Sequence, residues 1–321
     1  MNILNIKKQG SRHKVYLFGK KVLSYKGKRS KFENIYARRF DNLTMDEKIY
    51  IIKHQFKETA EYELNLDKPQ TFNEKLQWLK LFNEDPNITI AAGKDTAKEY
   101  VKKVIGEEYV VPNIAIYSSV DEIDFDKLPN EFVLKVNWGS GQNIIVRDKK
   151  TANIKEIKEK LNHWMQPTSN HYFFSFEFSY KNIIPKIVCE PYIGELKDNL
   201  TCYKVFNFGS KPYLIQAVFD DKTSYETINY YDLNWNKLDL RQNFPNNLKT
   251  MPAPKNLKKM LELAEKLAEP FPYFVRTDFY EIGDKILFSE FTFFSDNGMA
   301  AFHPKNWDQK LGDLIKLPNI V

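Results

Sequence analysis

Residues 274–280 read Phe-Val-Arg-Thr-Asp-Phe-Tyr, and residues 285–292 read Lys-Ile-Leu-Phe-Ser-Glu-Phe-Thr. The Gly283-Asp284 pair between these apolar runs predicts a β-hairpin. Asp278 and Glu290 are 12 residues apart, a spacing that lets the hairpin turn both carboxylates to one face. Phenylalanines surround them, and charged groups in such a setting usually have a partner or a metal. Two carboxylates are typical of a Mg²⁺ site completed by phosphate oxygens and water; polar residues on a half-buried sheet are the plainer alternative.

A second candidate site lies upstream, where residues 133–135 (Val-Leu-Lys) precede Gly139-Ser140-Gly141 and the apolar run 144–146. The pattern predicts two strands joined by a glycine turn, with Lys135 near the end of the first strand. Glycines let backbone N–H groups approach phosphate oxygens, and a lysine supplies a point charge. The segment is therefore a candidate phosphate-binding loop, although glycine hairpins without a ligand are also common.

A third candidate is Glu190-Pro191-Tyr192-Ile193, at the end of a predicted strand, followed later by Tyr203-Lys204. A carboxylate beside free backbone groups can accept a hydrogen bond from an adenine amino group. An ordinary strand end with a solvated glutamate is the alternative.

The periodicity of the whole chain predicts a helical N-terminal part and an α+β remainder with mostly antiparallel sheets. Helical signals extend from Thr44 to about Gly106, with a helix that Asp46 can cap, a capping pattern at Thr71 and a helix from Lys94. Beyond Gly106 the signals are mainly those of strands. The predicted strands are 109–111, 115–117, 132–136, 143–146, 187–193, 202–208, 213–219, 273–280 and 285–291, and the predicted helices are 154–165 and 256–268.

The composition excludes several classes of protein. The chain has 321 residues, of which 42% are apolar and 15% aromatic, enough for a stable core and too many for a disordered chain. Glycine occurs only 12 times and no long period recurs, which excludes collagen and repeat arrays. The motifs of dinucleotide enzymes, P-loop ATPases, zinc proteases and serine hydrolases are absent.

The net charge of +6 is unevenly distributed. Residues 1–40, most of a basic leader (residues 1–43), contain 12 Lys and Arg against one acid, a charge of +11 that leaves −5 for the other 281 residues. Short apolar runs around Gly19 predict a β-hairpin or a surface-lying amphipathic piece. The leader lacks the apolar block of a signal peptide, and no apolar run is long enough to predict a membrane span. The leader is either a solvated arm or a contact for a membrane face, an acidic glycan or nucleic acid.

Two cysteines without a zinc or disulfide pattern indicate buried thiols in a reducing cytoplasm.

The order of these features resembles that of ATP-grasp enzymes: Lys94, Lys135 with its glycine loop, Glu190, Lys204, Asp278 and Glu290. More narrowly, the chain resembles the TupA-like ATP-grasp family, named for teichuronopeptide biosynthesis, from about Pro69 to Leu317. The motifs that carry the resemblance are Thr71–Trp78, Gly106–Tyr109, Leu134–Gly141, Tyr180–Pro185, Phe274–Tyr280 and Ser289–Thr292. Three positions depart from the family pattern, which usually has His where Trp138 stands and Asp where Gly93 and Cys202 stand.

The resemblance implies roles for the candidate residues. Lys94 and Lys135 would contact ATP phosphates under a mobile loop, Gly139–Gly141, while Glu190 and the backbone near Tyr192 and Ile193 would hold adenine. Asp278 and Glu290 would bind Mg²⁺, with Thr292 as a weaker ligand. Arg276 would steady the transferred phosphoryl group, and Lys204 matches the lysine of the family's Asp-Tyr-Lys motif. The implied parts are the basic leader (1–43), a helical N-terminal part (44–108), a lid subdomain (109–186) and a C-terminal subdomain (187–321).

The resemblance also implies a reaction and its partners. ATP-grasp ligases transfer the γ-phosphoryl group to a carboxylate, and an amine then attacks the acyl phosphate, so charge neutralisation replaces a protein nucleophile. The family's association with bacterial surface polysaccharides implies a cytoplasmic ligase, peripheral on the inner membrane, for an amino acid or amine and a uronic acid of a glycan or sugar nucleotide. An ATP-grasp sugar kinase and a non-enzymatic basic glycan-binding protein are the alternatives. Nucleic acid is disfavoured as a partner, because no nucleic-acid motif is present.

Overall fold

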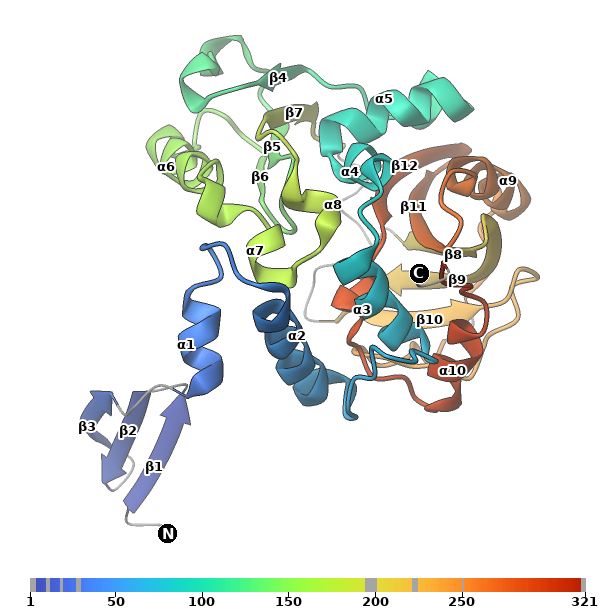
Figure 1. The fold of residues 1–321 in the computed structure, drawn as a ribbon. Coiled ribbons are helices and arrows are strands. Elements are labelled where there is room, and N and C mark those ends of the chain that lie inside the picture. The colour runs from blue at the N-terminus through green and yellow to red at the C-terminus, as the bar shows by residue number, and fades with distance from the viewer. Residues whose placement is uncertain are drawn as a thin grey trace. The chain divides into compact units, whose positions relative to one another are not determined.

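The structure, a computed structural model, describes residues 4–9, 12–17, 20–26, 30–193, 201–220, 225–249 and 251–318. The chain forms two compact units, Met1–Glu63 and Leu64–Val321 (Figure 1). The smaller unit contains a three-stranded antiparallel sheet and two helices: β1 (Leu4–Gln9), β2 (Arg12–Leu17), β3 (Lys20–Lys26), α1 (Lys31–Ala37) and α2 (Met45–Ala60). The expected hairpin corresponds to β2 and β3, while its turn at Gly19 lies outside the described residues. Thr44 and Glu47 form the capping box of α2, in place of the expected Asp46 cap.

Three helices open the larger unit: α3 (Phe72–Phe82), α4 (Pro86–Ala92) and α5 (Lys94–Ile105). The predicted capping box of α3 is present, because Thr71 accepts the Glu74 N–H and Glu74 accepts the Thr71 N–H. Helix α5 begins at Lys94, as the sequence predicts. The seven-residue α4 was not predicted, because so short a helix has little apolar periodicity.

Polar side chains of α3 hold the C-terminal end of the chain in place. The backbone N–H of Asn73 donates to Asp308 Oδ1 on α10 (Asn306–Gly312) at 2.9 Å, and its amide donates to the Ala300 carbonyl at 2.8 Å. Gly312 lies so close to α3 that a Cβ there would stand 2.3 Å from the Gln70 carbonyl oxygen. Part of the Thr71–Trp78 motif therefore serves packing between distant segments.

A four-stranded antiparallel sheet in the order β4-β7-β5-β6 forms one layer of the larger unit. Leu134, Leu161 and Ile187 lie in the core between this sheet and α6, with Trp138 at its edge. The elements of this part are η1 (Glu107–Tyr109), β4 (Ala115–Tyr117), η2 (Val120–Glu122), η3 (Phe125–Lys127), β5 (Phe132–Val136), β6 (Asn143–Val146), α6 (Ile154–Trp164), η4 (Pro167–Ser169), α7 (Tyr172–Ser175), α8 (Phe178–Lys181) and β7 (Ile187–Pro191).

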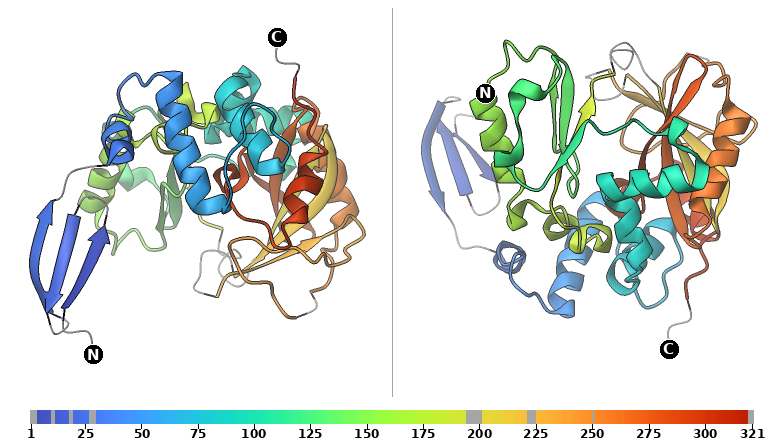
Figure 2. Two further views of the ribbon diagram at one scale, coloured as in Figure 1. Left: turned by 60° about the horizontal axis from the view of Figure 1, so that its bottom comes forward. Right: turned by 90° about the horizontal axis from the view of Figure 1, so that it is seen from above.

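A five-stranded antiparallel sheet in the order β10-β9-β8-β11-β12 forms the second layer (Figure 2). Helix α9 (Leu257–Ala268) packs its apolar residues, among them Met260, Leu263 and Leu267, against this sheet. The hairpin predicted from the sequence is β11–β12, and a short turn, η6, follows it. The bounds are β8 (Cys202–Phe208), β9 (Lys211–Phe219), β10 (Thr227–Tyr231), β11 (Phe274–Ile282), β12 (Lys285–Thr292) and η6 (Ser295–Gly298).

The predicted α+β class with mostly antiparallel sheets is confirmed, with two local corrections. The strand expected at 109–111 is wrong: residues 107–109 form η1, and only Val110 makes an isolated bridge, to Phe288. Pro112 follows at once, and proline cannot continue a strand ladder. Strand β10 was missed, since its asparagine is rare in strands and its pairing with β9 is a tertiary event. The division into four parts stays a prediction.

Both cysteines are buried thiols outside any disulfide, as predicted: Cys189 lies on β7 and Cys202 on β8. Burial, with a further contribution from Glu190, raises the pKa of Cys189 to about 11, so this thiol stays protonated at neutral pH. Among the helices that the structure describes, none has the length and apolar character needed to cross a bilayer.

Candidate active site

A row of polar side chains crosses all five strands of the larger sheet. Lys204 on β8 pairs with Asp278 on β11, which pairs in turn with Glu290 on β12. In the other direction Lys204 pairs with Gln216 on β9, and Gln216 with Tyr230 on β10. Directly opposed residues of antiparallel strands project from the same face. The sheet therefore brings three sequence-predicted site residues together on one surface and adds two that sequence reasoning missed.

Arg276 lies beside this row and binds Asp278 through two hydrogen bonds. Arg276 Nε donates to Asp278 Oδ1 at 2.8 Å, and Nη2 donates to Oδ2 at 3.0 Å. The same guanidinium donates to Thr292 Oγ1 at 3.0 Å and to Ser295 Oγ at 2.9 Å, and lies 4.0 Å from Glu290 Oε1. Two-pronged pairing fixes the guanidinium plane. Arg276 is thereby aimed along the surface that carries the carboxylates.

Burial and ion pairing act in opposite directions on the cations of this cluster. The Asp278 side chain is only 1% exposed, whereas that of Glu290 is 54% exposed. Burial lowers the pKa of Arg276, but the Asp278 carboxylate outweighs it and the net pKa is raised. Burial and Arg276 likewise lower the pKa of Lys204, yet Asp278, whose Oδ2 lies 3.7 Å from Lys204 Nζ, makes the net shift upward. Both cations therefore remain charged at neutral pH.

The Asp278, Glu290 and Thr292 oxygens fit a Mg²⁺ ion. Magnesium takes one or two carboxylates and completes its shell with water and phosphate oxygens. Each Asp278 oxygen has two acceptor positions, so the bonds from Arg276 leave one on each oxygen. Within the described ranges, no group of three or more His, Cys, Asp or Glu side chains could hold a metal. A donor set of two carboxylates and a hydroxyl suits an ion that brings its own phosphate ligands, and Mg²⁺ there stays a prediction.

A second charged cluster lies on the four-stranded sheet, around Glu190. Its Oε2 is 2.6 Å from Lys135 Nζ, and its Oε1 is 2.6 Å from Lys98 Nζ. Lys98, on α5, also donates to the Val111 carbonyl and to Asn113 Oδ1. Glu190 thus holds two lysines in place, and sequence reasoning missed Lys98 because only the fold brings it to Glu190. The adenine contact expected of Glu190 stays a prediction.

Lys94 joins the glycine loop to this cluster. Its Nζ donates to the Gly139 carbonyl at 2.6 Å. Burial lowers the pKa of Lys94, and the nearby Lys135 lowers it further, while Glu290 raises it. Gly141 has φ +69, a left-handed conformation that suits glycine, and both Ser140 and Gly141 are exposed. Lys94 therefore contacts the glycine loop and also lies within the electrostatic influence of Glu290 on β12.

A pocket of about 580 Å³ lies between η1, the end of β7, the start of α9 and the start of β12. Val111, Pro191, Ile193 and Leu287 supply apolar walls, and charged side chains also line it: Glu107, Glu108, Lys259, Asp284 and Lys285. Leu287 lies opposite Tyr280, two residues along β11 from Asp278, which puts Leu287 on the face of the polar row. A pocket of this volume with apolar walls and a few polar groups could take a purine base. Tyr192, next to Ile193, packs against Arg147, whose guanidinium lies 5.7 Å from the ring centroid.

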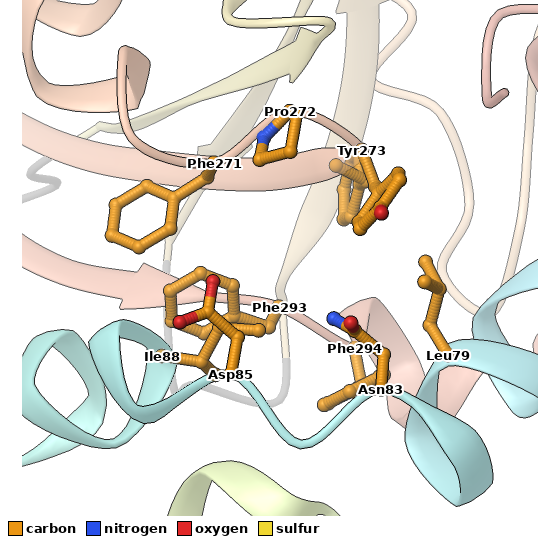
Figure 3. A pocket seen from close by; sticks show the side chains of 10 residues that line it. Leu79, Asn83, Asp85, Ile88, Phe271, Pro272, Tyr273, Phe293 and Phe294 are labelled. Carbon is orange, nitrogen blue, oxygen red and sulfur yellow. The ribbon is translucent and has the colours of Figure 1, made fainter. Parts of the chain in front are cut away.

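A smaller apolar pocket lies between the α3–α4 connection and the strand ends near Phe271 and Phe293 (Figure 3). Figure 3 shows Ile88 and Asp85 facing Phe271 across it. Its volume is about 20 Å³, room for about one water molecule. We therefore do not assign it a ligand.

Comparison with known proteins identifies the family. A family model described as TupA-like ATPgrasp matches residues 74–316, which include every candidate site residue. The chain belongs to the TupA-like ATP-grasp family. The resemblance inferred from the sequence motifs is thereby confirmed, and so is the ATP-grasp fold. No curated protein matches this TupA-like chain.

Solved structures of ATP-grasp proteins are remote from this TupA-like chain. The D-alanine–D-alanine ligase of Bacillus anthracis, complexed with ATP, is 15% identical over 67% of this chain and 57% of its own, with a TM-score of 0.36. The Helicobacter pylori D-alanine–D-alanine ligase is 13% identical, over 76% and 69%, with a TM-score of 0.40. The Staphylococcus aureus N5-carboxyaminoimidazole synthetase, complexed with ADP, is 14% identical, over 78% and 61%, with a TM-score of 0.40. The TupA-like chain thus spans little more than half of the first of these proteins, and such remote likenesses say nothing about its substrate.

Proposed function

We propose that this protein is an ATP-dependent carboxylate–amine ligase. It joins an amino acid or a small amine to the carboxylate of a uronic acid, in a bacterial surface polysaccharide or its precursor. ATP and Mg²⁺ are its cofactors. The observation that carries the proposal is the alignment of Lys204, Asp278 and Glu290 beside the buried guanidinium of Arg276. Membership of the TupA-like ATP-grasp family supports it.

The first step would transfer the γ-phosphoryl group of ATP to the carboxylate. A bond forms between a carboxylate oxygen and the γ-phosphorus, the bond to the β,γ-bridging oxygen breaks, and ADP leaves with that electron pair. Both reactants are anions, so positive charge must offset their repulsion in a site that excludes water. Arg276 and Lys204 supply two fixed cations on one face of the sheet. Asp278, Glu290 and Thr292 would hold Mg²⁺, which neutralises phosphate charge and orients the oxygens when bound.

The nucleotide would bind between the two sheets of the larger unit. The apolar pocket with Ile193 and Leu287 would take adenine. Lys94 and Lys135 would reach the phosphates under the Gly139–Gly141 loop, and Glu190 would keep Lys98 and Lys135 from repelling each other when ATP is absent. The resulting acyl phosphate is then open to attack by an amine. No covalent protein nucleophile is required.

The basic leader suits an anionic surface. A charge of +11 within residues 1–40 attracts acidic lipids or a uronic acid polymer. The rest of the chain carries −5, so this attraction belongs to the leader. We infer that the enzyme acts in the cytoplasm, beside the inner membrane face or the growing glycan.

The proposal is tested by measuring ADP release with product mass. Glucuronic and galacturonic acid, free and as uridine diphosphate sugars, are supplied with ATP, Mg²⁺ and free L-amino acids or ethanolamine. The expected product has the mass of the uronic acid plus the amine minus water, formed together with ADP and phosphate. A phosphorylated sugar with ADP and no amide would instead establish a sugar kinase. Absence of nucleotide turnover and binding, with glycan binding retained, would establish a non-enzymatic glycan-binding protein.

A further inference from the structure

The turn after β12 holds three consecutive residues in left-handed conformations: Asp296 at φ 50, Asn297 at φ 59 and Gly298 at φ 62. Such conformations cost energy for residues other than glycine, although Asp and Asn tolerate them best. Backbone strain of this kind persists only where the surroundings impose it, and it gathers at functional sites. Other residues must therefore hold this turn in its strained conformation, and the strain suggests that the turn has a function.

Helix α3 provides the anchor. Gln77 donates from its side-chain nitrogen to the carbonyl oxygens of Asn297 and Gly298, at 2.9 and 2.7 Å. Lys80, also buried, donates to the Asn297 carbonyl at 2.8 Å and to its side chain. These bonds from α3 fix the backbone of Asn297 and Gly298, and thereby the position of the neighbouring, exposed Asp296.

The Asp296 carboxylate lies beside the proposed phosphoryl site. Ser295 Oγ accepts a hydrogen bond from Arg276 Nη1 at 2.9 Å and donates to Asp296 Oδ2 at 3.4 Å. Asn243 donates to Asp296 Oδ1 at 3.0 Å, which orients the other oxygen of the carboxylate. Asn243 directly follows Gln242, whose Oε1 accepts the Tyr230 hydroxyl at 2.8 Å, so the same segment links Asp296 to the β10 end of the polar row.

That end of the row holds an unpaired acceptor. Tyr230 accepts from Gln216 Nε2 at 3.0 Å and donates to Gln242 Oε1 at 2.8 Å. All three side chains are buried, and Gln216 Oε1 has no hydrogen-bond partner. A buried acceptor without a donor costs free energy.

We propose that Asp296, oriented by Asn243 and flanked by the Tyr230–Gln216 wall, is the subsite for the amine substrate, which it binds as an ammonium ion. The inference rests on the proposed ligase function. An aliphatic amine is a cation at neutral pH, and a cation needs a carboxylate that is not already committed to Arg276 or to a metal. The hydroxyl of Ser295 stands between Asp296 and Arg276.

The balance of the second step gives Asp296 a chemical role. The ammonium passes one proton to the Asp296 carboxylate, and the nitrogen lone pair attacks the acyl carbon. The new C–N bond forms as the C–O bond to phosphate breaks, and phosphate leaves with that electron pair. One nitrogen-bound hydrogen remains in the amide. Of the two protons lost, one leaves with phosphate and the other passes from Asp296 to water.

The experiment compares a cationic with a neutral nucleophile. Hydroxylamine is mostly uncharged at neutral pH and traps acyl phosphates as hydroxamates, so it does not need an ammonium subsite. The variant Asp296→Asn keeps the size of the side chain and tolerates the left-handed backbone. We expect it to form hydroxamate from the uronic acid within about threefold of the wild-type rate. We expect its kcat/KM for the L-amino acids or ethanolamine to fall by roughly 100-fold or more.

A second variant and a control complete the design. Asn243→Ala removes the residue that orients Asp296; it is exposed, so the fold should be kept, and KM for the amine should rise roughly 10-fold. Asp121→Asn, at another exposed carboxylate on η2, should change neither rate. Unchanged amide formation in Asp296→Asn overturns the inference, and so does an equal loss of hydroxamate and amide. A wild-type protein that forms hydroxamate but accepts no cationic amine overturns it too. A wild-type protein that forms no hydroxamate overturns the ligase function itself.

Discussion

Arg276 and Asp278 stand two residues apart on β11 and bind each other through two hydrogen bonds, of 2.8 and 3.0 Å. Residues at i and i+2 of a strand share a face, so strand geometry alone brings the cation and the carboxylate together. Both are buried; Asp278 keeps Arg276 charged, while burial raises the pKa of Asp278 against the opposing effect of Arg276. Substitutions at this pair consequently affect folding as well as chemistry.

Substitutions of the two proposed metal ligands, Asp278 and Glu290, should have different effects on stability but similar effects on activity. Asp278→Asn removes the carboxylate that binds the buried Arg276 through two hydrogen bonds, so we expect a loss of about 3 kcal/mol in unfolding free energy. Glu290→Gln changes a half-exposed side chain and should alter stability by less than about 0.5 kcal/mol. Both should lower Mg²⁺-dependent ADP release by roughly 100-fold. Urea unfolding and ADP release measure the two effects. ATP turnover that persists after changing both residues to Ala would refute the metal assignment.

Glu190 should tie the stability of the lysine cluster to pH. Burial alone would raise its pKa, but Lys135 and Lys98 lower the net pKa below the usual value. The stabilisation is therefore present above the unfolded-state pKa and is lost as pH falls through the folded-state pKa. Glu190→Gln removes this dependence and leaves two lysines without their partner, which should cost about 2–4 kcal/mol at neutral pH and raise KM for ATP.

An exposed ion pair provides the matched control for that variant. Glu156 and Lys160 pair on one face of α6, with about half of each side chain exposed. Glu156→Gln should cost no more than about 0.5 kcal/mol and leave KM for ATP unchanged. Equal effects of Glu190→Gln and Glu156→Gln, measured by urea unfolding at several pH values, would show that the buried pairing of Glu190 with Lys98 and Lys135 does not stabilise the fold.

Because of Lys80, the unfolding free energy of the protein should increase with pH in mildly alkaline solution. Burial lowers its pKa from the usual 10.5 to about 7, against an opposing contribution from Glu177. Between about pH 7 and 10 the unfolded chain binds one more proton than the folded one, so unfolding free energy rises with pH by up to roughly 1 kcal/mol per unit. Lys80→Met removes this contribution. The difference between wild type and variant, by urea unfolding, should therefore grow in favour of wild type as pH rises. A constant difference would show that Lys80 titrates normally.

The basic leader should control association with anionic surfaces without affecting catalysis. Removing residues 1–40 should abolish co-sedimentation with vesicles rich in phosphatidylserine, and added salt should weaken binding of the full chain. ADP release in solution should stay the same, because every candidate site residue lies within 94–296. Unchanged vesicle binding after the deletion would mean that the leader has no membrane role.

Much of the site could be predicted because its residues are close in sequence or follow strong local patterns. The β11–β12 hairpin turns at Gly283-Asp284, so the spacing of Asp278 and Glu290 already aligned them. The capping box of α3 and the start of α5 were also local. The prediction of a strand at 109–111 was wrong because apolar content alone does not distinguish a strand from a short 3₁₀ turn ahead of a proline.

Local patterns in the sequence were enough to predict the family, the α+β class, the hairpin with its carboxylates and the glycine loop. The contact of Lys98 with Glu190, the extension of the polar row to Gln216 and Tyr230, and the position of Asp296 beside Arg276 emerged from the folded chain. Pairing between segments far apart in sequence is set by packing and strand register. No local period in the sequence encodes which distant residues will face each other.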